Sequence, residues 1–454
     1  MMKLSEAAVA TGGTVIGEDV LFASVSNDSR GDKAGQLFVA MRGERVDGHD
    51  FALSAIEHGA AAAMISHAVP GLPSALLVQD TRRALGDLAA WWRKKFDIPL
   101  AAITGSNGKT TVKEMLAAIL RAAAGGEDKV LATVGNLNND IGLPLTLLKL
   151  RAQHRYAVAE MGMNHFGEIS YLTGLARPTV ALVNNATTAH LGGLGSVAGI
   201  AQAKGEIFEG LSADGIAIIN ADDHFAGYWK SLAAGKRILT FGVEQPADVS
   251  ASFSLQAEYS DLQLKTPLGA ASLRLPVAGR HNVCNALAAT ATAIAMGMPL
   301  SHVVEGLAGF GGVKGRLQRK AGIGGAVVID DTYNANPASM KAAIDVLAAR
   351  EGKKLLVLGD MGELGDDAAA MHAEIGAYAR AAGMDAFYTL GELSAEMVKA
   401  FGAGAERHES PEALAAAISA AMHEGVNVLV KGSRFMRMER VVELITVNHQ
   451  RENH

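Results

Sequence analysis

The chain has 454 residues, enough for two or three domains with substantial cores. Its 41 basic and 47 acidic residues give a net charge of −6, which offers no reason to expect nucleic acid or an anionic membrane as a partner. The single cysteine, Cys284, excludes an intrachain disulfide framework, and no signal peptide or long apolar span is evident, so we expect a soluble, cytoplasmic protein.

The first 83 residues mix short strands with a helix. The pattern predicts one helix near Phe51–His58 and strands at Val20–Val25, Gln36–Ala40 and Ala75–Val78. A helix at Ala84–Phe96 follows the polar turn Asp80–Arg83, and we expect it to connect this region to the next one.

The second region, residues 84–315, has the pattern of an α/β domain. Its strands are predicted at Leu100–Thr104, Tyr156–Glu160, Val180–Asn184 and Gly215–Asn220. Because these runs are apolar on both faces, they favour a parallel sheet covered by helices. Residues 249–277 alternate instead, which predicts antiparallel strands, and a long helix is expected at His281–Met296.

The third region, residues 316–454, repeats the α/β pattern. Strands are predicted at Ala326–Asp330, Lys354–Leu358, Ala386–Leu390 and Val426–Lys431, and a last helix at Met436–Ile445. This pattern predicts a second open sheet, in which ligands bind at the carboxyl ends of the strands. The fold class is therefore α/β, with three domains at 1–83, 84–315 and 316–454.

The most informative segment is Thr104–Thr111, which reads T-G-S-N-G-K-T-T between an apolar run and an amphipathic one. A strand, a glycine loop and a helix together form a phosphate-binding loop, in which backbone N–H groups surround the phosphate. Lys109 can reach the β- and γ-phosphates, and the Thr110 hydroxyl can take a Mg²⁺ position. The general pattern expects a glycine at 103, where this chain has Ile103.

Three side chains are candidates for chemistry near this loop. Glu160 ends a predicted strand of the same sheet, where a carboxylate is well placed to hold Mg²⁺. His190 follows the strand Val180–Asn184 and would lie at the same edge of a parallel sheet, although an isolated histidine is more often structural. Lys204 lies on a predicted helix, where the pattern alone favours a solvated lysine.

The remaining candidate binding residues lie in two polar loops and at two positions of the first region. The loop Asn136–Gly142 carries three amides and a carboxylate, which suit a polar ligand, although an asparagine-rich turn is the alternative. The segment Asp330–Pro337 follows a strand and suits a ribose or a polar substrate, or else only begins a helix. Ser29 and Arg30 follow a strand, and Arg30 could meet a phosphate or a base.

Taken together, these segments resemble the Mur ligases, the ATP-dependent amide-forming enzymes of peptidoglycan synthesis. The resemblance runs almost end to end and includes the loop at 104–111, Gly135–Gly142, Ala203–Ile207, Gly279–Asn282, Asp330–Pro337 and Lys431–Arg434. Its motifs favour the branch that joins D-alanyl-D-alanine to UDP-MurNAc-tripeptide through an acyl phosphate. The resemblance implies a UDP-sugar domain, a central ATPase domain and a C-terminal Rossmann-like domain.

The resemblance also implies roles for individual residues and two Mg²⁺ ions. Catalysis would depend on Lys109, Glu160, His190 and Lys204. One metal would be held by Thr110 and Glu160, and the other by His190 and a carbamylated Lys204. ATP would be bound by Gly105, Ser106, Asn107, Gly108, Lys109, Thr110, Thr111, Asn285 (adenine), Arg316 (phosphates) and Asp331 (ribose). The uridine end would meet Ser29 and Arg30, and the UDP-MurNAc-peptide would meet Asn138, Asn139 and Asp140.

Two other functions remain open at this point. One is another member of the superfamily, such as MurE or folylpolyglutamate synthase, and the other is a nucleotide-dependent switch without ligase activity. The chain also departs from many relatives at Phe435, Met436 and Arg437, where they have small residues, which bears on dipeptide selectivity. We expect a monomer, and the sequence does not distinguish meso-diaminopimelate from lysine as the third residue of the acceptor peptide.

Overall fold

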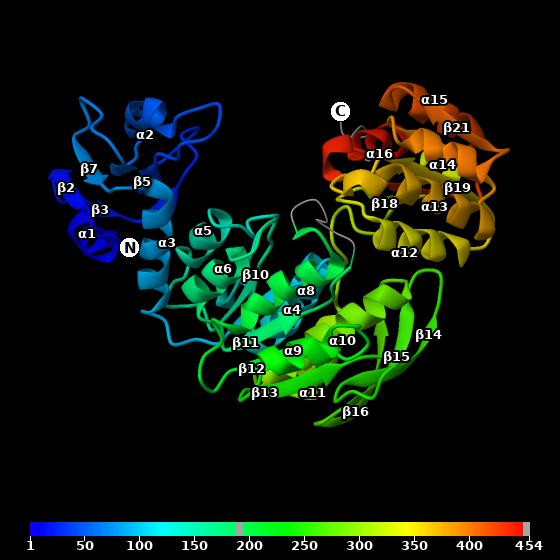
Figure 1. Ribbon diagram of the computed structural model, residues 1–454, viewed down its shortest axis with the longest axis horizontal. Helices are drawn as coiled ribbons and strands as arrows, with labels where there is room; N and C mark the ends of the chain where they lie inside the picture. Colours follow the sequence, from blue (N-terminus) through cyan, green and yellow to red (C-terminus); the bar gives the residue numbers. More distant parts are fainter. Residues whose placement is uncertain (188–193, 448–454) are drawn as a thin grey trace.

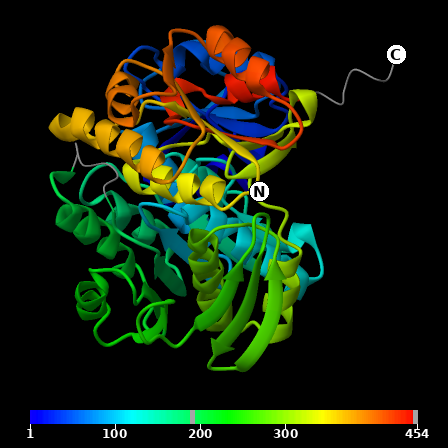
Figure 2. The ribbon, with the colours of Figure 1, turned by 90° about the vertical axis from the view of Figure 1, so that its right-hand side faces the viewer.

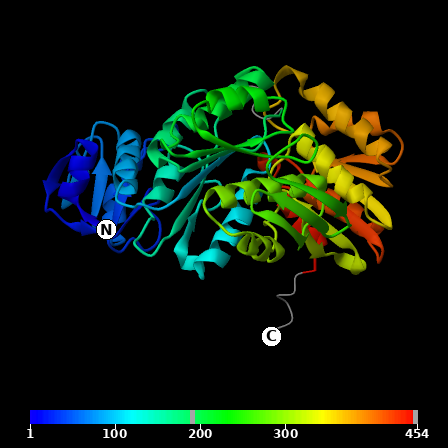
Figure 3. The ribbon, with the colours of Figure 1, turned by 90° about the horizontal axis from the view of Figure 1, so that it is seen from below.

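The computed structural model describes residues 1–187 and 194–447, and Figure 1 shows three α/β domains arranged along its long axis. The N-terminal and C-terminal domains stand at opposite ends of the central domain, and the view from below in Figure 3 agrees. Figure 2, seen from the C-terminal side, places the C-terminal domain above the central one. The predicted α/β fold is confirmed. In the described residues no helix is long and apolar enough to cross a membrane.

The N-terminal domain is a small mixed sheet flanked by helices. Four of the strands run parallel in the order β7-β6-β5-β4, and β2 joins the edge antiparallel to β7, while β1 and β3 form a separate pair. The prediction missed β1, α1, β2 and β6, and its single strand Val20–Val25 is two strands, β3 and β4, in the structure. The elements are β1 Met2–Lys3, α1 Leu4–Thr11, β2 Thr14–Gly17, β3 Leu21–Phe22, β4 Ser24–Ser26, β5 Gln36–Val39, the 3₁₀ helix η1 Gly48–Phe51, α2 Ala52–Glu57, β6 Ala62–Ile65 and β7 Ser74–Leu77.

The connecting helix α3 spans Thr81–Arg93, so it begins three residues before the predicted start. Asp80 explains this start, because its carboxylate accepts hydrogen bonds from the backbone N–H groups of Arg82 and Arg83 and so caps the helix. At the other end the buried Arg93 guanidinium donates to three backbone carbonyls, including that of Ala176 at 3.0 Å. The boundary expected at 83/84 lies inside this helix.

The central domain is built on six parallel strands in the order β13-β12-β11-β8-β10-β9. Its two central strands, β8 and β11, are buried along their whole length, which agrees with the apolar runs in the sequence. The strands are β8 Leu100–Thr104, β9 Val130–Ala132, β10 Tyr156–Glu160, β11 Val180–Val183, β12 Ile216–Asn220 and β13 Arg237–Phe241. The helices are α4 Lys109–Ala124, η2 Glu127–Lys129, α5 Gly142–Leu147, α6 Glu168–Ala176, α8 Val197–Gly205, η3 Glu206–Phe208 and α9 Ala226–Leu232.

A three-stranded antiparallel sheet extends the central domain, as predicted for residues 249–277. It consists of β14 Ser250–Leu255, β15 Ser260–Thr266 and β16 Gly269–Leu275. The predicted long helix follows as α10 Arg280–Ala295, and α11 Leu300–Ala308 comes after it. Both helices pack against α4, the helix that follows the phosphate loop.

The C-terminal domain is the second open sheet, in the order β17-β18-β22-β19-β20-β21, with only the edge strand β17 antiparallel. The last helix begins at Glu439 rather than Met436, because Arg437 takes a left-handed conformation (φ 51°) after a 3₁₀ turn. The strands are β17 Gln318–Ala321, β18 Val327–Asp331, β19 Lys353–Gly359, β20 Ala386–Leu390, β21 Ala405–His408 and β22 Val426–Lys431. The helices are η4 Ile323–Gly325, α12 Pro337–Ala348, η5 Gly365–Asp367, α13 Ala368–Ala381, α14 Ser394–Phe401, α15 Pro411–Ala421, η6 Arg434–Met436 and α16 Glu439–Ile445.

The hydrophobic cores divide the molecule unevenly. One core runs without interruption from Leu4 and Leu37 of the N-terminal domain, through Leu88 of α3, to Met161 and Trp229 of the central domain. The C-terminal domain has its own clusters on the two faces of its sheet. The first two domains are therefore joined by apolar packing, whereas the third meets the central domain through polar contacts.

Candidate active site

The phosphate-binding loop lies at the centre of the central sheet, where β8 ends between β10 and β11. Helix α4 begins at Lys109, directly after the glycines. Gly108 has a φ of +79°, and a Cβ there would lie 2.2 Å from the Asn285 Oδ1 and 2.6 Å from the Asn184 Nδ2. Both the conformation and the close approach require glycine at this position.

Asn107 is the centre of an amide network around the loop. Its backbone N–H donates to the Asn185 side chain at 2.8 Å, and its side-chain amide donates to the Thr187 hydroxyl at 3.0 Å. Its Oδ1 accepts a 2.8 Å hydrogen bond from Asn336, the residue that caps α12 of the C-terminal domain. The loop is thereby tied to the strand β11 edge on one side and to the C-terminal domain on the other.

Lys109 is held close to its own loop. Its Nζ donates to the Gly105 carbonyl at 2.7 Å. Burial lowers the pKa of Lys109, the Glu160 carboxylate opposes this shift, and the Arg316 guanidinium adds to it. A negatively charged phosphate would stabilise such a buried ammonium, so the side chain is suited to an anionic ligand.

Glu160 ends β10, the strand beside β8, and its side chain is almost fully buried. Its Oε1 accepts a 2.8 Å hydrogen bond from Asn138, and its backbone N–H donates to the Thr133 hydroxyl at 3.0 Å. Its Oε2 is buried and has no hydrogen-bond partner among the described residues. A buried carboxylate oxygen without a hydrogen-bond partner is unfavourable unless a cation binds it. This oxygen is therefore suited to coordinate a metal ion.

Lys204 lies on α8 and is only 1% exposed, so the solvated lysine that the pattern favoured is not what the structure contains. Burial lowers the pKa of Lys204 well below its ordinary range, and the charge of Lys109 lowers it further. Within residues 1–187 and 194–447 no group accepts a hydrogen bond from this ammonium. His190, the other expected ligand of the second metal, lies outside the described residues.

Arg316 and Thr110 join the loop to the segment that enters the C-terminal domain. The Arg316 Nη2 donates to the Thr110 hydroxyl at 3.0 Å, although the two residues are 206 positions apart. The Arg316 guanidinium lies 4.3 Å from the centre of the Tyr333 ring. Asp331, two residues before Tyr333, forms a 2.6 Å ion pair with the buried Lys431.

A cavity of 310 Å³ lies between the loop, α10 and the C-terminal domain. Expected ATP-binding residues that line it are Asn107, Gly108, Thr111, Asn285, Arg316 and Asp331. The sequence interpretation assigned no role to further lining residues, among them His281, Asn282, Val277, Phe310 and Lys431. The motif Gly279–Asn282 could have identified two of these residues, His281 and Asn282, from the sequence. Cys284 is partly exposed at this wall.

The residues expected to bind the sugar-peptide substrate each make a different contact in the structure. Of the amide loop, only Asn138 reaches Glu160. The Asn139 side chain accepts hydrogen bonds from the backbone at the start of α5, and Asp140 accepts a 2.8 Å hydrogen bond from Arg82 of α3. Arg30 is exposed in the N-terminal domain and pairs with Asp28 at 2.9 Å, next to Ser29.

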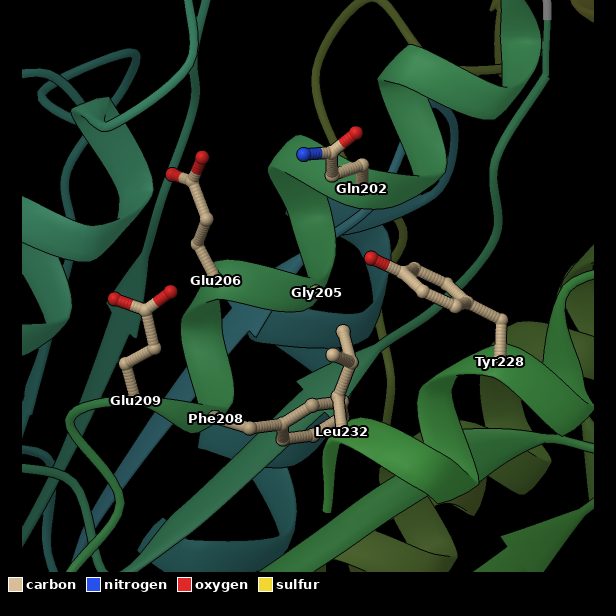
Figure 4. A pocket seen from close by; sticks show the side chains of 7 residues that line it. All are labelled: Gln202, Gly205, Glu206, Phe208, Glu209, Tyr228 and Leu232. Atoms are coloured by element: carbon tan, nitrogen blue, oxygen red, sulfur yellow. The ribbon is translucent and has the colours of Figure 1, made fainter.

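A second cavity of 330 Å³ lies at α8, η3 and α9, beside Gly205 and apart from the phosphate loop. Figure 4 shows Glu206 and Glu209 on one side of it and Tyr228 and Leu232 on the other. Both carboxylates already accept hydrogen bonds from the start of α6, at 2.8 Å from the Gly167 N–H and 2.5 Å from the Ser170 hydroxyl. These contacts give the two acids a structural role in joining helices.

The fold and the site define a three-domain α/β protein whose nucleotide-type cavity lies between a phosphate loop and a second sheet. Three family models match in chain order: the Mur ligase family catalytic domain at 22–93, the Mur ligase middle domain at 103–293, and the Mur ligase glutamate ligase domain at 315–434. The chain belongs to the Mur ligase family, so the resemblance seen in the sequence is confirmed.

Particular relatives sharpen this assignment. The chain is 42% identical to the UDP-N-acetylmuramoyl-tripeptide--D-alanyl-D-alanine ligase of Escherichia coli (strain K12), over 98% of this chain and 99% of the relative. It is similar to the crystal structure of MurF from Acinetobacter baumannii, with a TM-score of 0.92, 36% identity and 98% of each chain covered. It also resembles the MurF ligase of Thermotoga maritima in complex with ADP, with a TM-score of 0.83, 28% identity, and 94% of this chain and 98% of that chain covered.

Proposed function

We propose that this protein is an ATP-dependent ligase that adds D-alanyl-D-alanine to UDP-MurNAc-tripeptide, in the cytoplasmic synthesis of peptidoglycan precursors. The names of the relatives support the two substrates, because one of them shares 42% identity over almost the whole chain. The observation that carries the chemistry is the phosphate loop facing Glu160, whose second carboxylate oxygen is buried without a partner. A phosphate and a metal would meet at this place.

The cavity between the central and C-terminal domains is the proposed ATP site. The related ligase of Thermotoga maritima was solved with ADP, which supports a nucleotide here. The loop residues Gly105–Thr111 would surround the phosphates, and Arg316 would approach them from the other side. Asn285 is proposed to meet the adenine and Asp331 the ribose, since both line this cavity.

The residues around Glu160 fit divalent metal ions. Thr110 and Glu160 would hold one Mg²⁺, and His190 with Lys204 would hold the other. Mg²⁺ would neutralise the charge that builds up when two anions approach each other. Lys204 suits a carbamylated ligand, since burial lowers its pKa and so favours the uncharged amine, the form that adds CO₂. The carbamate would be an anion, so the lysine could then act as an oxygen ligand.

The proposed reaction has two steps. The terminal carboxylate of the tripeptide attacks the γ-phosphate of ATP, which gives an acyl phosphate and ADP, while Lys109 and Arg316 offset the negative charge. The free amine of D-alanyl-D-alanine then attacks the activated carbonyl carbon, and the tetrahedral intermediate collapses with release of phosphate. Closure of the C-terminal domain would exclude water, which otherwise hydrolyses the acyl phosphate.

The acceptor substrate would extend from the phosphate loop toward the N-terminal domain. Asn138 contacts Glu160 and is the proposed contact for the reacting end of the peptide. Asn139 and Asp140 are proposed to face the sugar-peptide from the same loop. Ser29 and Arg30 are proposed to bind the uridine end, which makes residues 1–83 the UDP-sugar domain.

The decisive experiment is mass spectrometry of the products formed from UDP-MurNAc-tripeptide, D-alanyl-D-alanine and MgATP. We expect the mass of the pentapeptide product together with dipeptide-dependent release of ADP. Meso-diaminopimelate, L-lysine and glutamate should be tested in parallel with the matching acceptors. Product with one of these amines alone would favour another branch of the superfamily, and ADP release without any amide product would favour a nucleotide-dependent switch.

A further inference from the structure

Tyr333 lies under Arg316 at the junction of the central and C-terminal domains. The ring centre is 4.3 Å from the guanidinium carbon, a distance typical of a cation–π contact. The Tyr333 backbone N–H also donates to the Gly315 carbonyl at 3.1 Å, so the tyrosine is fixed to the residue before the arginine. The other side of the guanidinium reaches Thr110 of the phosphate loop.

We propose that Tyr333 is a positioning residue whose ring aims the Arg316 guanidinium at the phosphates of the nucleotide. This inference rests on the proposed function, because it assumes that ATP binds in the cavity that Arg316 lines. Tyr333 itself does not line that cavity, so it would act on the nucleotide through the arginine.

An aromatic ring is suited to this task because it orients the cation without occupying its donors. A carboxylate partner would bind the N–H edge of the guanidinium, which is the edge that recognises phosphate. The Arg316 Nε is buried and has no hydrogen-bond partner among the described residues, while the Tyr333 ring centre lies 4.3 Å from the guanidinium carbon. Burial raises the pKa of the Tyr333 hydroxyl, although the charge and hydrogen-bonding of the neighbouring Arg316 guanidinium oppose the shift, so the hydroxyl stays uncharged at neutral pH and adds no negative charge beside the phosphates.

The contact can be tested by comparing Tyr333→Leu with Tyr333→Phe in the full-length protein. Isothermal titration calorimetry would measure the dissociation constants of MgATP and of adenosine, which lacks phosphates. We expect Tyr333→Leu to weaken MgATP about 5- to 20-fold, the range of a partly desolvated cation–π contact. Adenosine affinity should stay within about twofold, and Tyr333→Phe should restore MgATP binding because the ring is kept.

Two further variants separate positioning from a general structural effect. In an Arg316→Leu background, Tyr333→Leu should cause no additional loss of MgATP affinity, because the arginine through which it acts is gone. Tyr378→Leu is the matched control, since Tyr378 faces Lys341 at 5.6 Å on the surface of the same domain, and it should leave both constants unchanged.

Several results would overturn the inference: equal losses for MgATP and adenosine, a Phe variant as weak as the Leu variant, an additive double variant, or an unchanged Leu variant. Thermal denaturation of each variant would show whether it is folded, and the Phe variant keeps the test decisive if the Leu variant unfolds. Failure of the wild-type protein to bind MgATP would instead reject the proposed function, and the role of Tyr333 with it.

Discussion

At the scale of single residues, the site concentrates cations in a buried region. Lys109, Lys204 and Arg316 lie near one another, and burial lowers the pKa of both lysines. The negative charge of Glu160 raises the pKa of Lys109 and so opposes the effect of burial. Because the charges of Lys109 and Arg316 are costly in a protein interior without compensating anions, we expect the polyphosphate of the nucleotide to complete the arrangement.

Replacing Lys109 by methionine tests this interpretation. Lys109→Met keeps the length of the side chain and removes its charge, so it removes stabilisation of the transferring phosphate. We expect dipeptide-dependent ADP release to fall by a factor of about 10² to 10³ or more, in line with the loss of one preorganised donor. A coupled ADP assay measures this rate. Lys149→Met, at an exposed position of the same domain, serves as the control, and a variant at Lys109 that retained its rate would contradict the assigned role.

The reactivity of Cys284 is a second prediction at this scale. Burial raises the pKa of the Cys284 thiol from 9.0 to about 11. The thiolate is therefore scarce at pH 8, and alkylation by iodoacetamide should be about 100-fold slower than for an unshifted thiol. The rate should rise about tenfold for each pH unit up to about 11, since the thiolate is the reactive form. Mass spectrometry measures the adduct.

The same experiment tests the location of the nucleotide. Cys284 lines the cavity of the proposed ATP site, so saturating MgATP should slow the alkylation further. Cys284→Ser should give no adduct, because the chain has no other cysteine. Labelling that is fast at pH 8 and unaffected by MgATP would show that the thiol is more open than the structure indicates.

At the scale of elements, the helix after the phosphate loop is held by close packing. Helix α11 crosses α4 at Gly306, where a Cβ would lie 2.4 Å from the Ile119 Cα and 2.6 Å from its backbone nitrogen. Backbone atoms cannot move aside as a flexible side chain can, so only glycine fits. The position of α4, and with it the start of the loop at Lys109, depends on this crossing.

Gly306→Ala should therefore destabilise the protein. We expect the free energy of unfolding to fall by about 1–3 kcal/mol through overpacking, measured by urea denaturation. Gly174→Ala is the matched control in helix α6, because a Cβ at Gly174 meets nothing within 4 Å. That substitution should stabilise the helix by up to about 1 kcal/mol, and equal behaviour of the two variants would refute the packing argument.

At the scale of the whole molecule, the C-terminal domain has its own hydrophobic cores and is joined to the central domain by polar contacts. It shares few contacts with the rest of the chain beyond Arg316 and Asn336 near the phosphate loop. On the far side, Glu258 in the β14–β15 turn pairs with Arg319 at 2.7 Å and with Arg350 at 3.3 Å. Such partly exposed ion pairs contribute only about 0–1 kcal/mol each to stability, so they can favour one domain arrangement without making it rigid.

Removing Glu258 should therefore change the domain arrangement more than the stability. We expect Glu258→Ala to increase the radius of gyration measured by small-angle X-ray scattering without nucleotide, and saturating MgATP to reverse much of the change. The melting temperature should shift little. The control is Asp261→Ala, which removes an exposed ion pair with Arg274 inside the same three-stranded sheet. If Asp261→Ala increased the radius of gyration more than Glu258→Ala, the change would come from the three-stranded sheet and not from the contact between the domains.

The sequence determined the elements whose pattern is local. The four inner strands of each large sheet were predicted because they are largely apolar on both faces, whereas the edge strands β9, β13, β17 and β21 were missed. The phosphate loop was predicted because its glycines, lysine and threonines are adjacent in the chain. The helix α3 was predicted three residues late, since the capping role of Asp80 depends on a hydrogen bond that the pattern does not display. The strand β6, Ala62–Ile65, was missed because its alanine-rich sequence does not favour a strand.

Only the tertiary structure decided which distant residues meet. The pairs Arg316–Thr110 and Asn336–Asn107 join positions more than 200 residues apart, and they exist because two separately folded sheets face each other. The packing of α8 within the central domain buries Lys204, which the helical pattern had assigned to solvent. The sequence by itself thus predicted a phosphate-binding loop and the resemblance to the Mur ligases. The structure decided which residues line the cavity at the domain junction, because burial and charge there arise only when the domains come together.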